Sequence, residues 1–150
     1  MTGKHFEDLE IWQEARKLTN SIYDITKNEI FSKDSVLCDQ IRHAALSIMS
    51  NIAEGYEHGN SRELSQFLSI AKGSCGTVRS QLYIALDQEY IDAGKCVELI
   101  NKFKSLSISI NKSITHPKAT PYKNTEEKPK RGSIKKELEA IFDEVDKNKA

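Results

Sequence analysis

The sequence predicts an all-α protein: an antiparallel up-down-up-down four-helix bundle with a flexible C-terminal tail and a possible short fifth helix. Four segments repeat apolar residues at steps of three and four, which is the period of one buried helix face. The breaks between these segments are short, and short connections favour antiparallel neighbours. All three prolines lie after residue 116, in a stretch with little apolar surface to bury.

The first two helices are expected at 8–27 and 35–57, and the stretch 28–34 breaks the pattern between them. Their core stripes comprise Ile11, Ala15, Leu18, Ile22 and Ile25 in the first, and Leu37, Ile41, Ala44, Ala45, Ile48 and Ile52 in the second. Asn51 falls at the edge of the second stripe, where a buried amide needs hydrogen-bond partners. Gly55 would let the chain turn or let a neighbour approach closely.

The third and fourth helices are expected at 61–89 and 92–114. Gly59 and Asn60 favour a stop before the third helix, and Asn60 can cap it together with Glu63. The two stripes comprise Leu64, Phe67, Leu68, Ala71, Cys75, Val78, Leu82, Ala85 and Leu86, and then Cys96, Leu99, Phe103, Leu106, Ile110 and Ile114. Residues 106–110 also alternate with period two, so a local strand is an alternative that the neighbouring helices disfavour.

Composition bounds the class of protein. The net charge is zero, with 22 basic and 22 acidic residues, which argues against a simple, strongly basic nucleic-acid binder. We find neither a long apolar run nor a signal peptide, so we expect a cytoplasmic protein that does not contact a membrane. Cys38, Cys75 and Cys96 are widely spaced and are expected to be free, small hydrophobic residues.

The predicted domain organisation is a bundle at 1–115, a disordered basic linker at 116–132, and a short amphipathic helix or tail at 133–150. The range from Lys118 to Lys136 contains seven Lys or Arg residues and two Glu residues, which gives a local net charge of +5. The candidate nucleic-acid contacts are Lys128, Lys130, Arg131, Lys135 and Lys136, with a merely solvated tail as the alternative. The last segment repeats apolar residues at helical spacing: Ile134, Leu138, Ile141, Phe142 and Val145.

The second helix carries more apolar surface than one core stripe. A neighbouring sector holds the candidate oligomer contacts Arg42, Leu46, Met49, Ala53 and Tyr56. One stripe is enough to enter a bundle, so a second stripe predicts another copy of the chain on this side. The alternative is a wide core contact within a single chain.

Small residues lie opposite the core stripe of the third helix: Ser69, Gly73, Gly76 and Ser80. Each glycine inside a helix costs about 1 kcal/mol relative to alanine, so close approach of another backbone is the expected compensation. The approaching backbone is either that of a partner chain or nucleic-acid strand, or that of another helix of the same bundle at a tight crossing.

Signs of catalysis are weak. The four histidines are scattered, and no pair has the spacing of a metal-binding helix motif. Gly73–Gly76 lies in a helical pattern without a preceding strand, so it is not a phosphate-binding loop. We therefore expect a protein that is not an enzyme, and we assign no catalytic, cofactor-binding or metal-binding residue.

Several motifs together resemble a known family. They are Phe6-Glu-Asp-Leu9, Ile11-Trp12, Gln40-Ile-Arg42, Ser47-Ile48, Asn51-Ile-Ala-Glu-Gly55 and Phe67-Leu-x-Ile-Ala71-x-Gly-Ser74. In this order, over residues 6–114, the chain is similar to the four-helix-bundle proteins encoded within 23S rRNA intervening sequences. The resemblance implies a homopentamer without a demonstrated activity. The same broad fold includes the accessory variability proteins of diversity-generating retroelements, pentameric barrels that bind nucleic acid and a reverse transcriptase.

The expected function is therefore a non-catalytic, pentameric scaffold for RNA, other nucleic acid or a nucleoprotein partner. A sharper form makes it the accessory subunit of a reverse transcriptase. The alternative is a protein–protein interaction scaffold with no nucleic-acid role.

Overall fold

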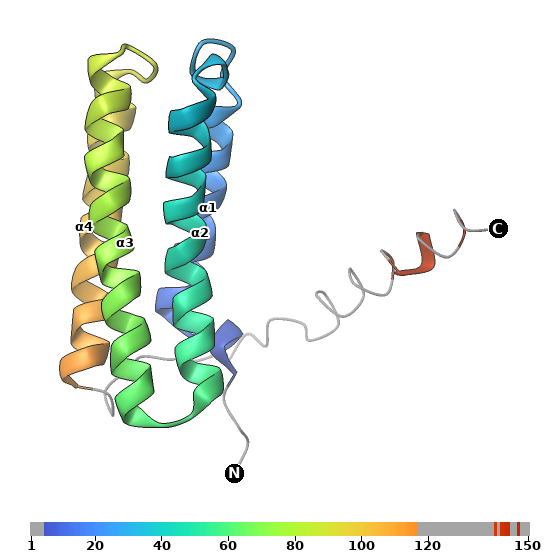
Figure 1. Ribbon diagram of the computed structural model, residues 1–150, viewed down its shortest axis with the longest axis vertical. Coiled ribbons are helices and arrows are strands. Elements are labelled where there is room, and N and C mark those ends of the chain that lie inside the picture. The colour runs from blue at the N-terminus through green and yellow to red at the C-terminus, as the bar shows by residue number, and fades with distance from the viewer. Residues whose placement is uncertain (1–4, 117–139, 141, 145–146, 148–150) are drawn as a thin grey trace.

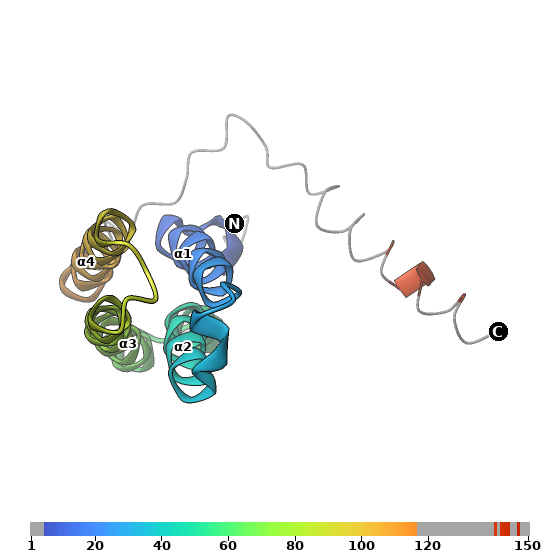
Figure 2. The same cartoon turned by 90° about the horizontal axis from the view of Figure 1, so that it is seen from above.

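The computed structural model describes residues 5–116, 140, 142–144 and 147. Within 5–116 the chain forms four long helices, α1 (Glu10–Thr26), α2 (Ser35–His58), α3 (Ser61–Asp87) and α4 (Ala93–Thr115), with short 3-10 turns η1 (Phe6–Asp8) and η2 (Phe31–Lys33). Successive helices run in opposite directions along one long axis (Figure 1). Seen from above, they surround a shared core in chain order (Figure 2). The predicted all-α, up-down-up-down bundle is confirmed.

The helix ends follow local sequence chemistry. Gly59 ends α2 in the left-handed region with φ 72°, a conformation that costs glycine little. The side chain of Asn60 accepts a hydrogen bond from the Glu63 backbone N–H at 2.9 Å, so the predicted cap of α3 is confirmed. The Glu63 carboxylate lies 3.2 Å from Nδ1 of His58. This contact ties the start of α3 to the end of α2.

The predicted stripes form the core. Their buried members include Ile11, Leu18, Ile41, Ile48, Leu68, Leu82, Leu99 and Phe103, and the three free cysteines are buried among them. Residues 106–110 are helical within α4, so the strand alternative is wrong there. Leu106 and Ile110 point into the core while Ile108 is exposed, as a helix and not a strand would place them.

A glycine allows α2 and α3 to pack closely against each other. Gly55 is buried, and a Cβ added to it would lie 2.9 Å from Cβ of Phe67 and 3.1 Å from Cδ1 of Leu64. Close approach of a neighbour is therefore the reason for this glycine. The predicted amide partners of Asn51 are also present: its Nδ2 donates to the Ser47 carbonyl at 2.7 Å and to Ser47 Oγ at 3.0 Å.

One end of the bundle is held by Asp34. Its Oδ1 accepts a hydrogen bond from the backbone N–H of Leu37 at 3.0 Å and thereby caps α2. Its Oδ2 accepts from the hydroxyl of Tyr90, in the α3–α4 connection, at 3.0 Å. This hydrogen bond raises the pKa of Tyr90 above its ordinary value. The two connections at this end therefore brace each other.

The predicted tail is only partly described. Residues 140, 142–144 and 147 are helical, which agrees with the expected short fifth helix at those positions. The rest of that segment, and the predicted linker after residue 116, lie outside the described residues. No helix in the described part of the chain combines the length and apolar character that crossing a membrane would need.

Burial of Cys75 gives a pH-dependent stability. Desolvation raises the pKa of its thiol from 9.0 to about 12. The unfolded thiol loses its proton near pH 9 and the folded one does not, so this stabilisation is present below pH 9 and is lost as the pH rises toward 12. We expect the free energy of unfolding to fall above pH 9 with a slope of up to about 1.4 kcal/mol per pH unit from this group.

Urea denaturation across alkaline pH, compared between the natural protein and Cys75→Ala, measures that slope. Burial also raises the pKa values of Cys38 and Cys96. These two thiols therefore make both the natural protein and Cys75→Ala less stable as the pH rises. The difference between them isolates Cys75. Equal slopes would show that the thiol is not protected in the folded protein.

Candidate functional site

The apolar second sector of α2 is the predicted subunit contact. In the structure, some of its residues pack within their own chain and others are partly exposed. Met49 and Tyr56 are half-buried and pack against the core of their own chain. Leu46 is 39% exposed, and Ala53 is half-buried. Leu46, Met49 and Ala53 follow each other at helical spacing, so they form one apolar strip that the chain covers only in part.

Arg42 is engaged within the chain. Its Nε donates a hydrogen bond to Oγ1 of Thr26 at 2.8 Å, and its guanidinium lies 4.7 Å from the ring centre of Tyr23. Both partners belong to α1. Met49 and Tyr56 follow Arg42 at steps of seven, so this flank of α2 faces α1. A subunit contact through Arg42 stays a prediction. The Arg42 side chain is already held by its contacts with α1.

The outer face of α3 is open. Ser69, Gly73 and Ser80 are exposed, and a Cβ added to Gly73 would meet nothing within 4 Å. The alternative of a tight crossing inside the bundle is therefore wrong for Gly73. Ile70 and Ile84 flank this flat surface and are also exposed, although both are large and apolar. The sequence signal for their exposure was that both lie outside the predicted core stripe of the third helix.

A groove runs between α1 and α4, the first and last long helices of the bundle. Its volume is about 440 Å³. The buried side chains of Ile11 and Leu106 contribute its apolar part. Its polar part comes from Glu10, Gln13, Glu14 and Lys17 on α1, and from Asn101, Lys102, Ser105 and Ser109 on α4. The short serine side chains of α4 leave this seam open.

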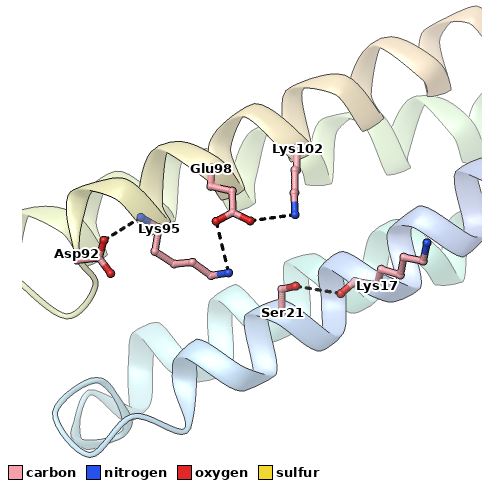
Figure 3. A network of polar contacts seen from close by, with 6 residues as sticks. All are labelled: Lys17, Ser21, Asp92, Lys95, Glu98 and Lys102. Carbon is pink, nitrogen blue, oxygen red and sulfur yellow. Dashed lines mark hydrogen bonds and ion pairs between the residues drawn. The ribbon is translucent and has the colours of Figure 1, made fainter.

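The charges beside the groove are paired. Glu98 lies 3.0 Å from Nζ of Lys102 and 3.7 Å from Nζ of Lys95 on the same helix, opposite Lys17 and Ser21 of α1 (Figure 3). The hydrogen bond from Lys102 lowers the pKa of Glu98. Because Glu98 neutralises the Lys102 ammonium, and Glu10 and Glu14 share the groove with Lys17, the groove does not select anions.

The described residues contain no group of three or more His, Cys, Asp or Glu side chains that could hold a metal ion. Their net charge is also informative: the range 5–116 has 12 Lys and Arg residues against 15 Asp and Glu residues, a net charge of −3. The predicted contacts Lys128, Lys130, Arg131, Lys135 and Lys136 lie outside the described residues. Positive charge for a polyanion is therefore concentrated outside the bundle.

These features define a class: a four-helix-bundle protein whose candidate functional features lie on its outer helix faces. A family model described as 23S rRNA-intervening sequence protein matches residues 7–112. The chain belongs to that family. The match covers all four helices apart from the last residues of α4.

A solved structure shares the fold. It is a protein of unknown function from the S23 ribosomal protein family of Bacteroides thetaiotaomicron, 20% identical, with a TM-score of 0.64 over 69% of this chain and 97% of that one. No curated protein matches the chain. The resemblance to the intervening-sequence family is thus confirmed, and the link to retroelement accessory proteins stays a prediction.

Proposed function

We propose that the protein is a non-catalytic, cytoplasmic scaffold that assembles into a homopentamer and binds RNA or a nucleoprotein partner. The observation that carries self-association is the strip formed by Leu46, Met49 and Ala53, which one chain covers only in part. Apolar surface of this kind is stabilised when a second copy excludes water from it. The open face of α3 around Gly73 is left for the partner.

Leu46→Asp tests the assembly. A carboxylate buried between subunits without a partner costs several kcal/mol, so we expect the particle mass to fall toward that of one chain. Leu46 is already 39% exposed, so the bundle itself should keep its helical circular dichroism. Gln40→Asp, at an exposed position of the same helix about 120° around its axis from Leu46, is the matched control and should leave the mass unchanged. An unchanged mass for Leu46→Asp would remove this strip from the interface.

The RNA-binding part of the proposal rests on charge. The stretch 118–136 has a local net charge of +5, whereas the bundle is negative. Phosphate contacts dominate the affinity for nucleic acid, and they release counterions when they form. Repeating a weak basic tail on five subunits raises the avidity without a new interface.

A salt titration of binding to single-stranded RNA tests this. Replacing Lys128, Lys130, Arg131, Lys135 and Lys136 by Gln should reduce the slope of log affinity against log salt by up to about 3.5, since each lost contact contributes about 0.7. The control replaces the exposed bundle residues Lys17, Lys27 and Lys33 by Gln and should barely change the slope. Equal slopes for the natural protein and the tail variant would contradict the role of the tail.

A sharper form of the proposal makes the protein an accessory subunit of a reverse transcriptase, and a reverse transcriptase gene beside its own would support it. The bundle charge of −3 favours a second candidate, a protein–protein scaffold with no nucleic-acid role. Purification at low salt distinguishes them. A particle that is free of nucleic acid and does not bind added RNA would favour the second candidate.

A further inference from the structure

One outer face of the bundle combines exposed apolar residues with positive charge. Nζ of Lys72 on α3 donates a hydrogen bond to Oδ1 of Asn111 on α4 at 3.0 Å, so these two positions adjoin. Arg79 and Tyr83 follow Lys72 at steps of seven and eleven along α3, and on α4 Ile108, Lys104 and Val97 precede Asn111 at steps of three, seven and fourteen. We define the α3–α4 face as Lys72, Arg79, Tyr83, Val97, Lys104 and Ile108.

This face is uncovered. Tyr83, Val97 and Ile108 are 54%, 55% and 56% exposed, although each is large and apolar. Between Lys72 and Arg79 lies Gly76, where an added Cβ would meet only the Arg79 guanidinium at 3.9 Å. The Arg79 Nε is buried and has no hydrogen-bond partner. The face therefore offers apolar surface and three cationic side chains.

The C-terminal segment of the same chain has the complementary pattern. Its apolar residues Ile134, Leu138, Ile141, Phe142 and Val145 fall on one side of a helix at helical spacing. Glu137 and Glu144 border this stripe on one side, and Glu139 and Asp146 border it on the other together with Lys135. Phe142 is helical and 66% exposed, so this apolar residue lacks cover. A helix of this length is marginal in water unless it docks.

Length and reach also agree. From Ile134 to Val145 is eleven residue steps, as from Val97 to Ile108 and from Lys72 to Tyr83, about 17 Å of helix in each case. The 18 residues between Thr115 and Ile134 can span up to about 60 Å when extended. The helix α4 is about 35 Å long at 1.5 Å per residue. The segment can therefore reach any point of the α3–α4 face.

We propose that residues 134–145 dock as a helix on the α3–α4 face of their own chain, with their acidic borders against Lys72, Arg79 and Lys104. The acidic borders favour this occupant over RNA, whose phosphates would be drawn instead to the basic residues 128–136 on the same chain. Docking also makes the positive charges of Lys72, Arg79 and Lys104 inaccessible to other polyanions.

Hydrogen–deuterium exchange of the full-length protein tests the docking. We expect backbone amides of residues 138–145 to exchange at least roughly tenfold more slowly than in an unstructured peptide. Phe142→Asp and the double variant Lys72→Glu/Lys104→Glu should both abolish this protection. Lys27→Glu/Lys33→Glu, at exposed positions away from the face, is the matched control and should preserve it.

Each other outcome overturns the proposal. Unprotected amides in the natural protein would show that the segment does not dock. Protection that survives Lys72→Glu/Lys104→Glu would place it elsewhere. Protection that rises with protein concentration would assign it to a second copy, and protection that requires added RNA would assign it to the RNA complex. The first two of these results do not depend on whether the protein binds RNA or forms a pentamer.

Discussion

Phe103→Ala is expected to lower the free energy of unfolding by about 3–5 kcal/mol. Phe103 lies on the core side of α4 and is completely buried, one of the largest such side chains in the bundle. Its removal loses the transfer free energy of the ring and leaves a cavity that helices packed on several sides can close only in part. Most of the stability of a domain of this size would be lost.

Urea denaturation followed by circular dichroism measures this loss. Val36→Ala is the control, because Val36 is 73% exposed on α2 and its truncation should change the stability by no more than about 0.5 kcal/mol. A Phe103→Ala protein as stable as the Val36→Ala protein would mean that α4 does not pack through this face.

The second large effect is a difference between two glycines. Gly55→Ala should destabilise the protein by roughly 1–2 kcal/mol, because its Cβ would lie 2.9 Å from Cβ of Phe67 and the α2 and α3 backbones must separate. Gly73→Ala should stabilise it by about 1 kcal/mol, because its Cβ enters open space and alanine is the better helix former. The same substitution is thus expected to act in opposite directions.

Chemical denaturation of the two variants beside the natural protein gives the difference, roughly 2–3 kcal/mol. Since both changes add one methyl group inside a helix, propensity is the same and only the surroundings differ. Two variants of equal stability would contradict the close α2–α3 contact at Gly55. A Gly73→Ala variant that is destabilised would show that the outer face of α3 is covered in solution.

Much of the fold could be predicted from the sequence because its signals are local. The caps at Asn60 and Gly59 fixed the α2–α3 connection, and the step of three and four residues fixed the core faces. The start of α1 was less predictable. Phe6–Asp8 forms a separate 3-10 turn and Leu9 is extended, so α1 begins at Glu10 and not at Asp8.

The candidate site was harder to predict, because periodicity gives the side of a helix and not its neighbour. The second sector of α2 combines a flank that contacts α1, through Arg42 and its partners Tyr23 and Thr26, with the partly exposed Leu46. A sequence pattern cannot separate the two. The groove between α1 and α4 was missed for the same reason, since it lies between two helices that are far apart in the sequence.

The particle mass in solution, measured by light scattering over a range of protein concentrations, tests the central claim most directly. Five chains of 17.0 kDa predict a mass of about 85 kDa that persists on dilution. A mass of 17.0 kDa at every concentration would show that the strip around Leu46 has no second copy to cover it, and would contradict the proposed scaffold.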